Sequence, residues 1–111
     1  MFQVFLLPRV EKELKKQFDK KELLELKTFV LGDLTEKGDK VGDQLTYPFL
    51  REKKINGKRI YYLVYKEIVI ILVVAISNKK SQKDTINEIK LYLSEYKKYA
   101  YDLYDKINKK D

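Results

Sequence analysis

The chain has 111 residues, of which 44% are hydrophobic and 37% are charged, and its formal net charge is +7. This length suits a single folded domain covering residues 1–111, because one core typically organises about 100 to 150 residues. Cysteine and histidine are absent, which excludes disulfides, cysteine-containing zinc sites and imidazole acid–base chemistry. Any chemistry must use other side chains, and we expect neither a metal nor another cofactor.

The longest unbroken apolar run extends from Ile68 to Ile76. It is much shorter than the roughly 20 residues that an α-helix needs to span a bilayer. The first residues also lack the charged leader that precedes the apolar core of a signal peptide. These features predict a cytoplasmic protein with no membrane partner.

The positive charge is concentrated in one part of the chain. Residues 51–83 contain nine lysines and arginines but only two glutamates, whereas the rest of the chain contains fifteen residues of each sign. A generally lysine-rich composition would spread the excess evenly, so this distribution favours a polyanion-binding face.

The first half of the chain predicts a strand followed by a helical hairpin. Residues 2–7 are rich in β-formers, and Pro8 both ends the strand and suits the first turn of a helix. Asp19 and Glu22 have the spacing of a capping box at the start of a second helix. Apolar residues recur at helical spacing in both helices: Val10, Leu14 and Phe18 in the first, and Leu23, Leu26, Phe29, Val30 and Leu34 in the second.

Residues 37–43 form the loop into the second half, where the dipeptide Asn56-Gly57 predicts a two-residue β-hairpin turn. This turn pairs Ile55 with Lys58 and Lys54 with Arg59 across the two strands. Further along, it pairs Glu52 with Tyr61 and Leu50 with Leu63. The alternation then predicts two faces, with Ile55, Ile60, Tyr62 and Val64 on one and Lys54, Arg59, Tyr61 and Tyr65 on the other.

The continuous apolar residues 68–76 predict a central strand covered on both faces. Thr85 and Glu88 have capping-box spacing at the start of a long helix. Its apolar stripe comprises Ile86, Ile89, Leu93, Tyr96, Ala100, Leu103 and Ile107. The expected fold is α+β: an N-terminal strand, a helical hairpin, an antiparallel sheet of three or four strands and one long C-terminal helix.

Two groups of cations are candidates for anion binding. Lys54 opposite Arg59 is an unfavourable cation pair that requires a compensating anion. Glu52 could supply that anion as a structural partner, or a phosphodiester could supply it while a base stacks on Tyr61. Both interpretations stay open at this stage.

The second group is the run from Lys79 to Lys83 before the last helix. The N-terminus of a helix carries partial positive charge and free amide donors, so three lysines there favour an anion site over a simple solvated loop. Because strand ends and hairpins can meet at one edge of a sheet, we expect both basic groups to line one groove.

Two stretches resemble the RelE/ParE toxin superfamily. The sequence LREKKINGKRIYYLVY (residues 50–65) is similar to the family's basic hairpin. The sequence VVAISNKKSQKDTINEI (residues 73–89) resembles the phage-derived, HigB-like branch. The expected order of elements, β-α-α-β-β-β-α, also matches this superfamily.

The resemblance implies a ribosome-dependent mRNA endonuclease, in which the 2′-hydroxyl attacks the adjacent phosphate and leaves a 2′,3′-cyclic phosphate. By position, Arg59 would brace the phosphate, Lys54 would act as base or charge stabiliser, and Lys79 or Lys80 would protonate the leaving oxygen. Arg51 would complete the catalytic set. The remaining RNA-binding candidates are Lys53, Lys58, Tyr61, Tyr65, Gln82 and Lys83. The implied partners are mRNA, the ribosome and a cognate antitoxin that forms a hetero-oligomer with the toxin.

This sequence departs from the family pattern in several ways. The tyrosine expected after the basic run is replaced by Asp84-Thr85, so Tyr61, Tyr65 or Tyr92 would have to provide base stacking. The hairpin register places Arg51 opposite Tyr62 on the core side, and a bulge in the first hairpin strand would reverse this.

Other functions are also compatible with the sequence: a ParE-like gyrase poison, which the cationic cluster argues against, an inactive RNA-binding homologue, or a basic ribosome-associated protein. The C-terminal helix carries several tyrosines that could form an antitoxin-docking surface. In the alternative, Tyr96 belongs to the core and the others are ordinary surface residues; they are Tyr92, Tyr99, Tyr101 and Tyr104.

Overall fold

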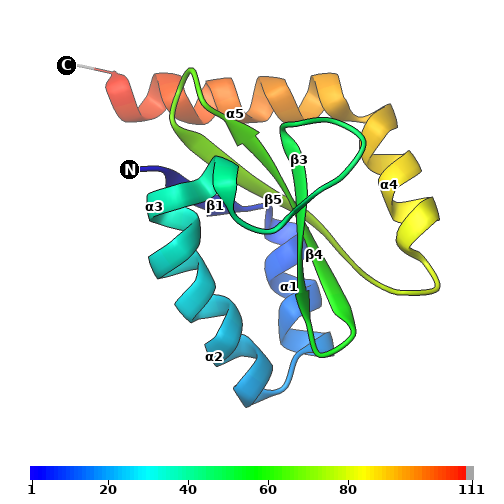
Figure 1. Cartoon of the computed structure of the whole chain (residues 1–111). Coiled ribbons are helices and arrows are strands. Elements are labelled where there is room, and N and C mark those ends of the chain that lie inside the picture. The colour runs from blue at the N-terminus through cyan, green and yellow to red at the C-terminus, as the bar shows by residue number, and fades with distance from the viewer. Residues whose placement is uncertain (110–111) are drawn as a thin grey trace.

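The computed structural model describes residues 1–109, which form a five-stranded sheet with helices on both faces (Figure 1). The strands in spatial order are β1 (Gln3–Leu6), β5 (Ile70–Asn78), β4 (Lys58–Tyr65), β3 (Leu50–Ile55) and β2 (Asp43–Gln44). β1 runs parallel to β5, and the other neighbouring strands are antiparallel. No helix within residues 1–109 is long and apolar enough to cross a membrane.

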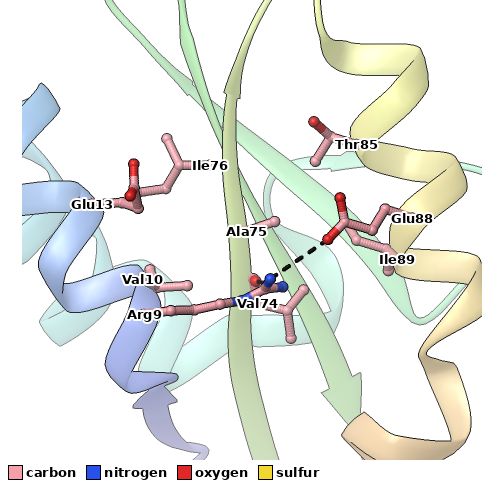
Figure 2. Close-up of a pocket in the computed structure, with 9 residues that line it drawn as sticks. All are labelled: Arg9, Val10, Glu13, Val74, Ala75, Ile76, Thr85, Glu88 and Ile89. Atoms are coloured by element: carbon pink, nitrogen blue, oxygen red, sulfur yellow. Dashed lines mark hydrogen bonds and ion pairs between the residues drawn. The ribbon is translucent and has the colours of Figure 1, made fainter.

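The helices belong to two groups that are separate in sequence. The first group consists of α1 (Pro8–Gln17), α2 (Lys20–Phe29), a π-helical turn η1 (Val30–Leu34), α3 (Thr35–Lys37) and a 3-10 turn η2 (Gly38–Lys40). The second group consists of α4 (Gln82–Leu91) and α5 (Leu93–Asn108). In Figure 2, α1 and α4 lie on opposite sides of β5.

Local signals in the first half of the chain form as expected. Pro8 occupies the first turn of α1. Asp19 accepts a hydrogen bond from the backbone N–H of Glu22 (2.8 Å), and the Glu22 carboxylate accepts one from the backbone N–H of Asp19 (2.9 Å). The predicted capping box is therefore confirmed, and it sets the start of α2.

The hairpin of β3 and β4 also has the predicted turn and register. Asn56 and Gly57 both have positive φ, 49° and 80°, as a type I′ turn requires. All the predicted pairs are present, including Lys54 with Arg59 and Glu52 with Tyr61. The only register shift in these ladders lies between β4 and β5, so Arg51 remains opposite Tyr62.

β5 is the covered strand that the apolar run predicts. Residues 70–74 are at most 1% exposed, and they belong to one continuous hydrophobic cluster. α1, α4 and α5 all contact this strand. The sheet differs from the expected one in two respects: it gains the two-residue strand β2, and β1 pairs in parallel with β5. Apolar patterning indicates which strands are buried but carries no information on the direction of a distant partner.

The C-terminal helix also differs from the expectation. It begins at Gln82, three residues before Thr85, and Thr85 donates its backbone N–H to Ser81 instead of capping the helix. It then breaks at Tyr92 (φ −109°, ψ 16°). The break bends the chain sharply (Figure 1), so that residues of both helices are buried against the sheet; these are Ile89, Tyr96 and Ala100. No proline or glycine marks the bend, so packing and not local sequence sets it.

Candidate functional site

The two basic groups lie at the same end of the sheet. Arg59 on β4 pairs with Ser77 on β5, only two residues before Lys79. Across the hairpin, Gln82 at the start of α4 donates from Nε2 to both oxygens of Glu52 on β3, at 3.3 and 3.0 Å. The start of α4 therefore lies against the hairpin, which brings the two basic groups to one end of the sheet. That they line one groove stays a prediction.

Glu52 is the centre of this site. Its side chain is 2% exposed, and Oε1 lies 3.6 Å from Arg59 Nε and 4.0 Å from Lys54 Nζ. The sequence left two possible anions for the pair of Lys54 and Arg59, Glu52 or a phosphodiester. In the protein alone, Glu52 is the anion beside both cations. A buried charge requires such a partner, because burial removes the water that would otherwise stabilise it.

Arg59 is 9% exposed, and its Nε has no hydrogen-bond partner. The 3.6 Å separation from Glu52 is an ion-pair distance but is too long for a hydrogen bond. A buried donor without an acceptor is rare and costly in proteins. The Arg59 guanidinium therefore retains an unused donor that an additional anion oxygen would satisfy.

The other cations of this group are on the surface. Lys54 is half exposed, and its Nζ lies between Asp43 (3.9 Å) and Glu52 (4.0 Å). Lys79 and Lys80 in the β5–α4 turn and Lys83 in the first turn of α4 are all exposed. The turn is shaped by Asn78, whose Oδ1 accepts from the backbone N–H of Ser81 at 3.0 Å.

The tyrosines expected near the site are buried. Tyr61 has no exposed surface and shares a 2.7 Å hydrogen bond with Ser77, while burial raises the pKa of its hydroxyl. Tyr65 is 8% exposed, and burial raises its pKa further. Neither ring offers a free face to a base in this arrangement. Tyr92 is 46% exposed, but it lies at the α4–α5 break.

Arg51 lies on the opposite face of the sheet from Arg59. It donates from Nε to the carbonyl of Val41 (2.7 Å) and from Nη2 to the carbonyl of Gly42 (3.0 Å). Tyr62, its cross-strand partner, also donates its hydroxyl proton to Val41. Arg51 thus holds the loop before β2 in place.

Lys53 and Lys58 share this second face. Lys53 Nζ lies 5.0 Å from the centroid of the Phe29 ring on α2. Lys58 Nζ forms a 2.7 Å ion pair with Glu22, which is 5% exposed. The structure therefore divides the predicted set into one group around Glu52 and another group against α2.

Comparisons with known proteins identify the fold. No family model matches the sequence, and no curated protein matches it. Among solved structures, the free Escherichia coli toxin RelE, in a form with two arginines changed to alanine, has a TM-score of 0.65 at 18% identity, covering 80% of this chain and 95% of that one. The same toxin bound to an antitoxin RelB peptide has a TM-score of 0.60 at 17% identity, covering 76% and 93%. The toxin–antitoxin complex RelBE2 from Mycobacterium tuberculosis gives 0.59 at 18% identity, covering 70% and 98%.

This chain has the RelE fold. The order of elements that the sequence predicts for a RelE-like protein is thus confirmed at the level of the fold. Two residues near the site, Ser77 and Asp43, were not predicted from the sequence. The position of Ser77 opposite Arg59 follows once β5 is aligned with β4. Asp43 gave no signal because residues 37–43 were expected to be a loop, whereas it belongs to the short strand β2.

Two further features of this RelE fold bear on function. Among residues 1–109, no group of three or more carboxylate side chains is arranged to hold a metal ion. On the C-terminal helices, Tyr96 is buried, which agrees with the alternative prediction that it belongs to the core. The exposed large side chains there are Leu91, Tyr92, Tyr99, Tyr104 and Ile107.

Proposed function

We propose that this protein is the toxin of a toxin–antitoxin pair and that it cleaves mRNA on the ribosome, and hence acts in the cytoplasm. The observation that carries this proposal is a buried arginine with an unused donor, Arg59, surrounded by exposed lysines at one end of a RelE fold. Such a site supplies both a directional phosphate contact and a field that attracts RNA.

The proposed reaction is internal transesterification. The 2′-hydroxyl loses its proton to a base and attacks the neighbouring phosphorus; the bond to the 5′-oxygen breaks, and that oxygen takes up a proton. Arg59 would stabilise the charge on the phosphate, and Lys54 would act as base or charge stabiliser. Lys79 or Lys80, beside the start of α4, would donate the proton to the leaving oxygen.

The proposed protein partner is an antitoxin. Two of the similar solved structures contain a RelE-type toxin together with an antitoxin. On this chain, exposed aromatic and aliphatic side chains gather on α4 and α5, and tyrosine is a frequent interface residue. We therefore propose a toxin–antitoxin hetero-oligomer.

A second candidate function is RNA binding without cleavage. It is favoured by the Glu52 carboxylate beside Arg59 and by the burial of Tyr61 and Tyr65. In this alternative, the exposed lysines bind the RNA backbone, and Arg59 serves only to pair with Glu52.

Cleavage can be tested by adding the protein to a translation extract and mapping mRNA 5′ ends by primer extension. We expect wild type to create new 5′ ends, and Arg59→Ala and Lys54→Ala to lower the cleavage rate by about 100-fold or more, as is typical for loss of a transition-state contact. Lys12→Ala, an exposed lysine on α1, is the matched control and should cleave normally. Unchanged 5′ ends with wild type, together with tight RNA binding, would favour the second function instead.

A further inference from the structure

The Glu52 carboxylate lies next to Arg59, where the proposed function would place a phosphate. It is almost fully buried, although Lys54 on the same face is half exposed. The Glu52 carboxylate therefore lies where an RNA phosphate would have to approach Arg59.

This internal pairing is incomplete. Glu52 Oε1 is 3.6 Å from Arg59 Nε, and that Nε has no hydrogen-bond partner. Arginine can bind two oxygens of a phosphate or of a carboxylate with parallel N–H donors, but Glu52 makes no hydrogen bond to Arg59 Nε. A phosphodiester oxygen within hydrogen-bond distance of this Nε would thus supply the acceptor that Glu52 does not.

Glu52 is held in this position by α4. Gln82 donates to both carboxylate oxygens, and it is the first residue of that helix. The half-exposed Lys54 has its Nζ 4.0 Å from Glu52 Oε1, so a second cation besides Arg59 lies near this carboxylate.

We propose that Glu52 competes with RNA phosphate for Arg59, and that Gln82 locks this competitor in place until the first turn of α4 shifts. This inference rests on the proposed function of the same site, to which it adds a built-in restraint. The position of α4 then controls access of a phosphodiester to Arg59.

The test is the affinity for a short fluorescent RNA whose 2′-hydroxyls are methylated, so that internal attack is blocked. Glu52→Gln keeps the shape of the side chain and a hydrogen-bond acceptor for Gln82, but removes the charge. We expect it to bind this RNA about tenfold more tightly than wild type, since one charge-assisted contact is gained. Asp43→Asn removes the same charge near Lys54 without freeing Arg59, and should gain no more than about twofold.

Two further variants make the result specific. Arg59→Ala in the Glu52→Gln background should abolish the gain. Gln82→Leu removes the lock without changing charge and should also bind RNA more tightly; it decides the question if Glu52→Gln does not fold, as judged by circular dichroism. Equal affinities of the Glu52→Gln and Asp43→Asn proteins, or an unchanged affinity of Gln82→Leu, would overturn the proposal.

These measurements are independent of cleavage. Tighter binding by Glu52→Gln and Gln82→Leu without mRNA cleavage by wild type would support the restraint and refute the nuclease. Normal cleavage by wild type with no change in affinity would support the nuclease and refute the restraint.

Discussion

Two buried glutamates fix the hairpin to the helices on either side of it. Glu22 on α2 accepts hydrogen bonds from Lys58 and Asn56, while Glu52 accepts from Gln82 on α4. The hydrogen bonds that the Glu22 carboxylate accepts favour its ionised form, so Glu22 is most stabilising while it stays ionised. Glu22 therefore links the protonation of one residue to the stability of the whole hairpin.

Glu22 gives a prediction for acid stability. The hydrogen bond from Lys58, followed by those from the backbone of Asp19 and from Asn56, lowers the pKa of Glu22 from 4.5 to about 2. Since the folded-state pKa is the lower one, its contribution is fully present above about pH 4.5 and is lost as the pH falls towards 2. We expect Glu22→Gln to lower the melting temperature at pH 7 and to flatten its pH dependence in this window.

Glu25→Gln is the control for this measurement, because Glu25 is an exposed carboxylate on the same helix. Thermal unfolding followed by circular dichroism from pH 2 to pH 7 compares the three proteins. A Glu22→Gln curve parallel to that of wild type would show that Glu22 is not the linked group.

At the scale of elements, one arginine connects helices that are far apart in sequence. Arg9 on α1 donates to the carbonyl of Val74 on β5 (3.0 Å) and to the hydroxyl of Tyr96 on α5. In Figure 2 its side chain extends from α1 to β5, and its guanidinium is directed towards Glu88 of α4. Arg9 also lines a cavity of about 240 Å³. β1 pairs with β5 only as far as Val73, so Arg9 occupies the edge of β5 just beyond the last strand pair.

We predict that Arg9→Ala lowers the free energy of unfolding by about 1.5 to 3 kcal/mol, the range for hydrogen bonds that involve a charged group. Glu88→Ala is the matched change on the other side of the ion pair. That pair is long, 3.6 Å, and both side chains are more than half exposed, so its loss should cost less than about 1 kcal/mol. Urea denaturation measures both values, and equal costs would mean that the ion pair and not the hydrogen bonds provides the stability.

At the scale of the whole molecule, the lysines and arginines of the β3–β4 hairpin are divided between the two faces of the sheet. Lys54, Arg59 and the lysines of the β5–α4 turn lie around Glu52, whereas Lys53 and Lys58 are directed at α2. The lysines of the first group are exposed, whereas Lys58 is paired with Glu22 and Lys53 lies over the Phe29 ring. Substitutions in the first group should therefore change the affinity for a polyanion much more than substitutions in the second group.

The salt dependence of RNA binding tests this division. Each lysine that neutralises a phosphate releases counterions, so Lys54→Ala and Lys80→Ala should each lower the slope of log affinity against log salt by roughly 0.7 to 1. Lys53→Ala should leave the slope unchanged, because its ammonium group lies over the Phe29 ring. The methylated RNA described above serves as the ligand, and an equal effect of Lys53→Ala would indicate a diffuse charge field without a defined face.

Local interactions made part of this structure predictable. The Asn56-Gly57 turn sets the pairing of β3 with β4, and the two-residue period of a strand then assigns Lys54 and Arg59 to one face and Arg51 to the other. The capping box of Asp19 and Glu22 involves residues three apart, so it depends little on the rest of the fold. The sequence alone therefore determined the α+β class, the hairpin register and the concentration of charge.

Long-range packing decided the remainder. Glu52 and Gln82 are thirty residues apart and meet only because α4 lies across the hairpin. The bend at Tyr92 and the parallel pairing of β1 likewise follow from how helices and strands cover the sheet. The sequence allowed Glu52 or an external phosphate as the partner of Arg59, and only the tertiary structure shows that Glu52 takes this place and that both side chains are buried, because burial is set by the packing of the whole core.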